Sequence, residues 1–287
     1  MKTVATNRTS KAGFGLTELM VTLVVLAVVL SAVFFTLHRS QHQTQRMTKV
    51  AEMRQMARTA VQLIERESRM AGSGWGRIVV QGSNNGVPWS IQAVNPGYGT
   101  LAHSDSVVLV GAWQASTTLS AGMPNSSSIL KVNSVAGFNV NDLVIITDGS
   151  HAHVFQVTAT NSASLDIQHN PSSVYNAPGG HSGWPAGGYG AGANLYKITM
   201  ATYRYDSTSY RKPALVRQEV GGTPQIVAYN VAGFHVWYEL EDGTWTRNPL
   251  DMTQVDKVIP VVLTKVSDSR LATLSDSVWA AVRPRTF

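Results

Sequence analysis

The chain has 287 residues, of which 44% are hydrophobic and 14% charged, which is enough for one large or two small folded domains. It contains no cysteine, which excludes disulfides, thiolate metal sites and a cysteine nucleophile. The formal net charge is +6, but Lys2, Arg8 and Lys11 supply three of these charges. The remainder is only mildly basic, so its charge alone does not indicate a nucleic-acid-binding domain.

An apolar run of about 24 residues extends from Phe14 to Leu37, and about 20 suffice to cross a bilayer as a helix. Three basic residues and no acidic residue precede it, so the positive-inside bias places the amino terminus in the cytoplasm and the bulk of the chain outside. A conventional secretory cleavage site would follow the run, and residues 30–32 (LSA) match that pattern poorly. The run therefore predicts one membrane-spanning helix that is retained.

Residues 11–18 read KAGFGLTE, and this stretch resembles the cleavage site of type IV prepilins. The shared pattern is a basic leader that ends in Gly, then Phe, then Glu four residues after Phe. The resemblance implies a leader at 1–13, cleavage by a membrane peptidase between Gly13 and Phe14, and N-methylation of Phe14. It also implies a non-enzymatic filament subunit without a cofactor, whose partners are other pilins, the prepilin peptidase and the inner-membrane assembly platform.

Glu18 is an acidic residue within the apolar run, where a carboxylate costs about 2.5–3.5 kcal/mol. Cleavage after Gly13 creates an α-amino cation at Phe14, one helical turn away or available to a neighbouring subunit. Opposite charges attract far more strongly in a low dielectric than in water. We therefore predict that Glu18 sets the register of subunits in a helical stack. The alternative is a carboxylate that merely lies at the headgroup boundary.

The helical period continues past the membrane and then ends at a glycine cluster. Glu65 lies four residues before Arg69, which is the spacing of a helical ion pair, and Gly72 begins the cluster. We predict one helix over 14–72, with 14–37 in the membrane. Its amphipathic stripe, which is typical of core packing, consists of Met47, Val50, Met53, Ala57, Ala60 and Ile64.

Residues 73–287 contain short runs of period two between Gly, Ser, Asn and Pro clusters, which indicates antiparallel β structure. The predicted fold class is α+β: a long amino-terminal helix packed on a mainly antiparallel β head, with an inserted β unit at 126–170. Asp148-Gly149 and Asp242-Gly243 predict hairpins, and Pro260 predicts an edge strand or a bulge. Strands are expected at Ser106–Val110, Leu143–Thr147, Ala152–Thr158, Leu195–Tyr205, Ala214–Glu219, Phe234–Leu240 and Val258–Val266.

Two further segments resemble PilW-type minor pilins: 195–240, and the helix end with the sequence ERESRMAGSGWG. This resemblance implies a minor pilin that starts pilus assembly with other minor pilins, first in the inner membrane and then in a fimbrium outside the cell. Such pili serve twitching motility, cell adhesion or DNA uptake. The alternatives are a pseudopilin of a type II secretion system and, from another class, a membrane-anchored hydrolase or binding module on a single span.

Two residue clusters in the head could bind a metal. His151 and His153 are two apart on a predicted strand and would share a face, with Asp148 nearby, but no third ligand has a recognisable spacing. Asn139, Asn141 and Asp142 offer oxygen donors for calcium without the EF-hand spacing. We expect hairpin and turn roles for both clusters, and no metal.

Three other stretches have the residue types of an active or binding site. His103, Ser104 and Asp105 have the residue types of a catalytic triad, but no G-x-S-x-G nucleophile elbow is present. The Gly-rich loop 171–193 contains Trp184 and Tyr189, which either pack within the head or form a contact surface for a partner. Basic and aromatic residues alternate at Tyr203-Arg204-Tyr205 and Tyr210-Arg211-Lys212, which a hairpin explains equally well. We expect neither catalysis nor nucleic-acid binding here.

Overall fold

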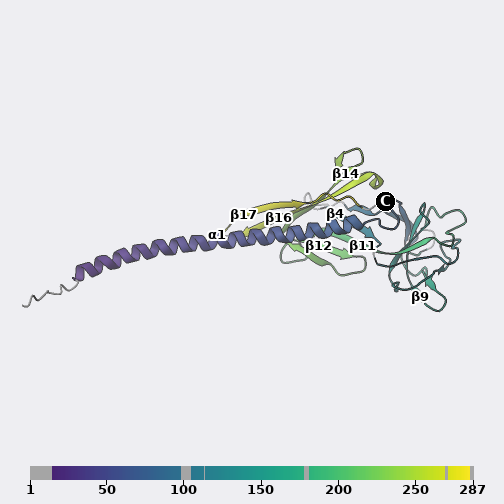
Figure 1. The fold of residues 1–287 in the computed structure, drawn as a ribbon, viewed down its shortest axis with the longest axis horizontal. Helices are drawn as coiled ribbons and strands as arrows, with labels where there is room; N and C mark the ends of the chain where they lie inside the picture. Colours follow the sequence, from purple (N-terminus) through teal and green to yellow (C-terminus); the bar gives the residue numbers. More distant parts are fainter. Residues whose placement is uncertain (1–14, 98–104, 113, 178–180, 269–270, 285–287) are drawn as a thin grey trace, which may run out of the picture. The chain divides into compact units, whose positions relative to one another are not determined.

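The computed structural model describes residues 15–97, 105–112, 114–177, 181–268 and 271–284. The chain divides into two compact units, Met1–Ala51 and Glu52–Phe287, which are described separately. One helix, α1 (Leu16–Met70), begins in the first unit and ends in the second (Figure 1). It contains no glycine or proline, the two residues that most disfavour a helix interior, so nothing in its sequence interrupts it.

The predicted glycine cluster does end the helix. Gly72, Gly74 and Gly76 all have positive φ angles, of 75°, 103° and 67°. Because residues with a side chain rarely adopt positive φ, these glycines let the chain reverse immediately after Met70. The Gly72 N–H donates to the Val110 carbonyl at 2.9 Å, which fixes the helix end against β4 (Ser106–Gly111).

A ten-stranded, mainly antiparallel sheet forms most of the second unit. The long strand β11 organises it, because β7 and β5 pair with the beginning of β11 and β12 and β4 pair with its end. A single parallel pair joins β1 to β8. Besides β4, its strands are β1 (Val80–Asn84), β2 (Val87–Ile91), β3 (Val94–Gly97), β5 (Ser116–Thr118), β7 (Leu143–Thr147), β8 (Ala152–Gln156), β11 (Asn194–Asp206), β12 (Ala214–Glu219) and β13 (Gln225–Tyr229).

Two smaller sheets complete the unit. One has the order β6-β10-β9, with β6 (Leu130–Lys131), β9 (Ala159–Asn161) and β10 (Asp166–Gln168). The other has the order β15-β14-β16-β17, preceded at β16 by a 3-10 turn η1 (Met252–Gln254). Its strands are β14 (Val231–Leu240), β15 (Trp245–Thr246), β16 (Val255–Asp268) and β17 (Leu271–Trp279).

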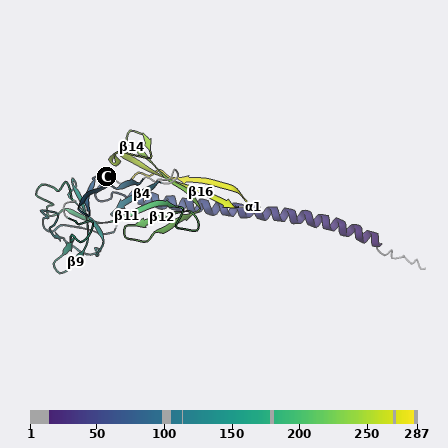
Figure 2. The same ribbon diagram turned by 180° about the vertical axis from the view of Figure 1, so that it is seen from behind.

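The carboxy-terminal part of α1 packs between the two larger sheets. Figures 1 and 2 both show β11 and β12 on one side of it and β16 and β17 on the other. Ala57, Ala60, Val61 and Ile64 are buried there in one apolar cluster with side chains of β4, β11, β12, β14 and β16. The stripe predicted from the sequence is buried from Met53 onward, whereas Met47 is 62% exposed.

The predicted fold class is confirmed, since a long amino-terminal helix packs on a mainly antiparallel head. All seven predicted strands occur, and the bounds of β7 and β12 match the predicted ranges. Both predicted hairpins also form, at β7–β8 and β14–β15. In segment 126–170, β7 and β8 belong to the ten-stranded sheet and β6, β9 and β10 to the small one. Its origin as an insertion stays a prediction.

Of the two alternatives predicted for the strand of Pro260, the edge position is wrong, because β16 lies between β14 and β17, whereas register shifts of the β-bulge kind do occur along β16. Val258 exchanges backbone hydrogen bonds with Val282, and Val261 pairs with Trp279, so the same register runs past Pro260 on the β17 side. In this register Ala280 lies opposite Pro260, and β17 ends one residue earlier, at Trp279, so no strand partner needs the N–H that proline lacks. The N–H that Pro260 lacks would therefore face the gap between the end of β17 and the bridge at Val282, and β16 can stay inside the sheet.

Candidate functional site

The candidate assembly segment is the amino-terminal end of α1. Gly13 and Phe14, the predicted cleavage and methylation residues, lie outside the described residues. Gly15 is the first described residue and accepts hydrogen bonds from the N–H groups of Glu18 (3.0 Å) and Leu19 (3.2 Å). Gly15 thus occupies the cap position immediately before the helix.

Glu18 closes a reciprocal cap at this helix end. Its Oε2 accepts a hydrogen bond from the Gly15 N–H at 3.2 Å, while its own N–H donates to the Gly15 carbonyl. The side-chain bond is one half of a capping box, in which Glu or Gln at the third helical position accepts from the N–H of the cap residue. Gly15 has no side chain to supply the other half. A carboxylate at this end also interacts favourably with the helix dipole. The sequence did not reveal this second role, although Glu three residues after a cap is its signature.

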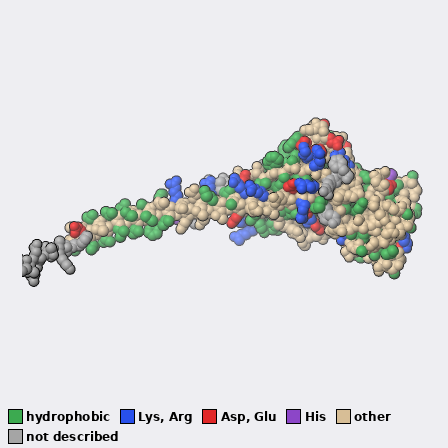
Figure 3. Space-filling view, viewed as in Figure 1, with side chains coloured by type: hydrophobic (Ala, Val, Ile, Leu, Met, Phe, Trp, Pro, Cys, Tyr) green, Lys and Arg blue, Asp and Glu red, His purple; other side chains and the backbone are tan. Residues whose placement is uncertain are grey.

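The first part of α1 is apolar on all sides and uncovered within its own unit. Its large side chains are exposed by 46% (Leu30) to 80% (Leu16), and an 18-residue window has a mean hydropathy of 2.7. Figure 3 shows these hydrophobic side chains along the beginning of the helix. By length and composition the helix is a candidate membrane span. A helix that is apolar all round is stable only when lipid or other protein covers it.

The few polar side chains in this segment need no water. The hydroxyls of Thr22, Ser31 and Thr36 each donate to the backbone carbonyl four residues earlier, at 2.6, 2.7 and 2.9 Å. Such bonds satisfy the hydroxyl within the helix itself. The segment between Glu18 and His38 therefore suits a hydrocarbon environment in its hydrogen bonding as well as its composition.

A buried ion pair ties the carboxy-terminal end of α1 to the ten-stranded sheet. Glu67, only 4% exposed, accepts hydrogen bonds from the Tyr203 hydroxyl (2.7 Å) and from Arg217 Nε (3.0 Å) and Nη2 (2.9 Å). Burial and the Glu67 charge raise the pKa of Tyr203. Burial opposes the charge of Arg217, but its bonds to Glu67 and Glu219 raise its pKa overall. The predicted pair Glu65–Arg69 also forms, at 2.5 Å on the exposed side.

His151 and His153 do not share a strand face, so that expectation is wrong. His151 precedes β8 in the hairpin turn, where its Nδ1 contacts Asp148 at 3.2 Å. His153 is fully buried; its Nε2 donates to the Ser182 carbonyl (2.8 Å) and its Nδ1 accepts from the Tyr189 hydroxyl (2.6 Å). Burial is the main cause that lowers the pKa of His153 to about 4. Both ring nitrogens are occupied, which leaves no ligand position.

The Gly-rich loop is packed rather than presented as a contact surface. Tyr189 is 1% exposed and belongs to an apolar cluster with Phe155 and Leu195. The Trp184 indole N–H donates to the Pro124 carbonyl at 3.1 Å, and its ring lies 4.7 Å from that of His153. The packed alternative for this loop is therefore the one observed.

The possible calcium ligands instead form a turn. Asp142 Oδ2 accepts from the Asn139 N–H at 2.7 Å and pairs with Lys197 Nζ at 2.8 Å. Asn141 has a φ angle of 73°, which asparagine tolerates in turns. Among the described residues, no group of three or more His, Cys, Asp or Glu residues is placed to hold a metal ion.

The possible catalytic and nucleic-acid residues also have structural roles where they are described. His103 and Ser104 lie outside the described residues, and Asp105 accepts from Arg247 Nη2 (2.7 Å) and from the Val236 N–H (3.0 Å). Tyr203 is fully buried and cannot stack on a base. Tyr210, Arg211 and Lys212 lie in the turn between β11 and β12, as the hairpin interpretation predicted.

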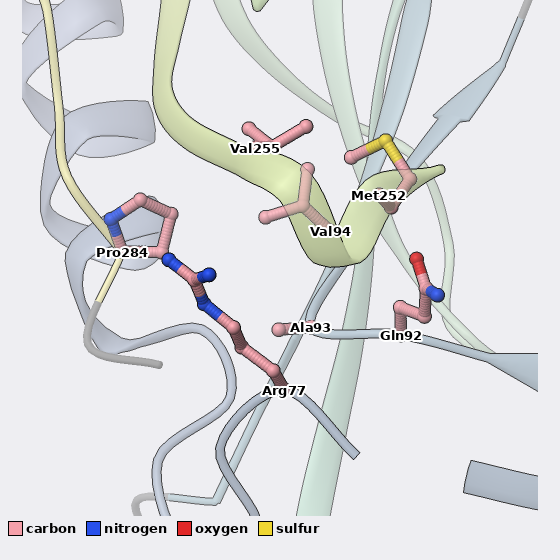
Figure 4. Close-up of a pocket in the computed structure, with 7 residues that line it drawn as sticks. All are labelled: Arg77, Gln92, Ala93, Val94, Met252, Val255 and Pro284. Carbon is pink, nitrogen blue, oxygen red and sulfur yellow. The ribbon is translucent and has the colours of Figure 1, made fainter. Parts of the chain in front are cut away.

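One of several cavities in the head lies between β3 and β16 and has a volume of about 20 Å³, whereas an open one of about 460 Å³ is lined by Asp142, Lys197 and Glu219. Figure 4 shows Arg77, Met252 and Pro284 around the smaller cavity. The Arg77 guanidinium pairs with the Glu241 carboxylate and donates to the Thr253 carbonyl at 3.1 Å. The smaller cavity can hold a water molecule but no substrate.

Comparison with known proteins gives a match at the amino-terminal end of the chain, where the sequence predicts a prepilin cleavage site. Residues 8–34 match the family model described as the prokaryotic N-terminal methylation motif. No curated protein and no solved structure matches the chain. The matched residues include the predicted cleavage site, Glu18 and most of the uncovered apolar helix. The match supports a membrane-anchored, prepilin-like protein of the type IV pilin or pseudopilin kind.

Proposed function

We propose that this chain is a minor type IV pilin that takes part in starting pilus assembly. The observation that carries the proposal is that the methylation motif at 8–34 coincides with a helix that is apolar on all sides. A helix of this kind can lie first in a bilayer and later against other such helices in a filament. Proteins with this motif are typically structural rather than catalytic, and the role requires no cofactor.

The proposed processing divides the chain into a leader at 1–13, a helical stem at 14–72 and a head at 73–287. The peptidase cuts between Gly13 and Phe14, Phe14 is methylated, and the stem spans the inner membrane once with its amino terminus in the cytoplasm. The subunit then joins other pilins and minor pilins through the assembly platform. The PilW-type assignment rests on the sequence resemblance of 195–240 and of the helix end.

Two other functions compete with this proposal. A type II secretion pseudopilin carries the same motif and an equivalent helix. A membrane-anchored hydrolase or binding module would need available polar groups in the head. Asp142, His153 and Asp105 are each engaged in contacts within the chain, which favours the structural role over that class.

The first experiment is mass spectrometry of the amino-terminal peptide of the protein made in its own cells. We expect a peptide that begins with methylated Phe14. A peptide that retains Met1, or that begins after the apolar run, would contradict the filament proposal.

Processing should depend on the size of residue 13. We expect Gly13→Ala to be processed at least about tenfold faster than Gly13→Leu, because a bulky side chain in a subsite shaped for glycine costs about 1–3 kcal/mol. Pulse-chase labelling followed by electrophoresis measures the mature fraction. Equal rates for the two variants would remove Gly13 from the cleavage site.

Glu18 has two candidate roles that two substitutions separate. Glu18→Gln retains the hydrogen bond to the Gly15 N–H and loses the charge, whereas Glu18→Ala loses both. We expect both variants to enter the membrane and to be cleaved, and both to incorporate poorly into filaments, because neither can pair with the Phe14 amine of a neighbour. The measurement is the variant content of sheared pili. Normal incorporation of Glu18→Gln alone would assign the role to capping and refute the charge pairing.

A further inference from the structure

The first turns of α1 beyond the apolar run present a cationic face, which consists of His38, Arg39, His42 and Arg46 and takes its charge from the two arginines. At 3.6 residues per turn these side chains fall within an arc of about 100°. His42 is half-buried and the other three are exposed. Residues 19–51 contain no aspartate or glutamate. The cationic face therefore has no carboxylate along its own stretch of helix.

The cationic face begins immediately after Leu37, where the apolar run ends. At 1.5 Å per residue it extends about 12 Å along the helix. The headgroup layer on each side of a bilayer is about 5–8 Å thick, and long arginine side chains can bend toward it. With the apolar run in hydrocarbon, the whole cationic face is within reach of lipid phosphates.

The basic residues on both sides of the apolar run also favour the binding of an anion. Three basic residues precede the run, and Arg39, Arg46 and Lys49 follow it within a similar distance. Basic residues flanking a span are disfavoured on the translocated side. With the orientation proposed above, the three cations that follow the run are on the translocated side, and an anion that binds the cationic face would offset this cost.

The two histidines of the cationic face are hydrogen-bonded to each other. Their Nε2 atoms lie 3.0 Å apart, and their rings meet edge to face with centroids 4.4 Å apart. This contact is a hydrogen bond in which the Nε2–H of one ring donates to the Nε2 of the other, so it holds the two rings together beside the arginines. Arg46 lies one turn further along the same side of the helix.

We propose that the cationic face binds the phosphate groups of anionic phospholipids and holds the stem at a fixed depth in the membrane. The proposal rests on the insertion of the apolar run that the proposed function requires. Each arginine near an anionic surface contributes about a fivefold preference for anionic over neutral lipid. The preference falls with salt, because counterions screen charges at the surface.

Fluorescence quenching in vesicles tests this proposal on the full chain. Because the chain has no cysteine, Gln45→Cys provides a single site for a fluorophore beside the cationic face. The labelled chain is reconstituted in phosphatidylcholine vesicles that contain a minor fraction of nitroxide lipid. The nitroxide lies near the top of an acyl chain, and the headgroup is either phosphatidylglycerol or phosphatidylcholine.

We expect about fivefold or greater preferential quenching by nitroxide phosphatidylglycerol, and a ratio near one in Arg39→Gln/Arg46→Gln. The matched control Arg211→Gln/Lys212→Gln removes the same charge from the head and should retain the preference. Equal quenching by the two lipids in the parent chain would overturn the proposal. Absence of quenching by either lipid would instead refute membrane insertion, and with it the proposed function.

Discussion

Arg217→Met is expected to lower the free energy of unfolding of the head by about 3–5 kcal/mol, because it leaves the buried Glu67 carboxylate without a cation. Glu67→Met should cost less, since Arg217 Nη2 keeps a second carboxylate, Glu219, at 2.8 Å. Tyr203→Phe removes one hydrogen bond to a charged group and should cost about 1.5–3 kcal/mol. Together these groups fasten the end of α1 to β11 and β12.

Urea unfolding of the full chain in detergent measures these differences. All tryptophans lie at position 75 or later, so their fluorescence reports on the head alone. The double variant Glu67→Met/Arg217→Met is the control, because removing both partners of a buried pair leaves no uncompensated charge. A double variant as unstable as the sum of the single variants would show that the two residues act independently.

The head is expected to lose about 3 kcal/mol of stability through His153 alone between pH 6.5 and pH 4. The folded head holds this imidazole neutral with a pKa of about 4, whereas the unfolded chain takes up a proton near pH 6.5. Unfolding therefore binds a proton throughout this window, and stability falls as the pH falls, until it levels off below about 4. Burial also lowers the pKa of His169 and His181, which adds to the loss in the same direction.

The free energy of unfolding as a function of pH checks this expectation. His153→Gln should reduce the slope between pH 4 and pH 6.5, because the glutamine amide does not titrate. An unaltered slope in His153→Gln would show that this ring does not bind the proton taken up on unfolding.

Patterns with a local cause were predictable from the sequence. The helix end follows from three glycines at positive φ, and the hairpins follow from Asp148-Gly149 and Asp242-Gly243. Polar and apolar residues alternate along β14, which marks its two faces. In each case the residues that determine the structure are neighbours in sequence.

Features that depend on distant pairing were not predictable. The place of Pro260 inside a sheet depends on the register that joins Val258 to Val282, and no local pattern encodes it. Glu67 lies three residues after Ile64, and this helical spacing places it on the buried stripe. Its partner Arg217 is 150 residues away in the sequence, so no local pattern predicts the ion pair. The shared face expected for His151 and His153 was wrong because β8 begins at Ala152, as predicted, which leaves His151 in the hairpin turn before it.

The core cluster around α1 also determines when the head can fold. It joins Ala57 and Ile64 to Val258 and Val262, which lie about 200 residues later in the chain. Because such distant contacts form only after the intervening chain is available, the helix stripe stays incompletely covered until nearly the whole protein has been made. Chains truncated before β16 would leave part of this stripe exposed, so only chains with a complete head would be fully protected from proteolysis.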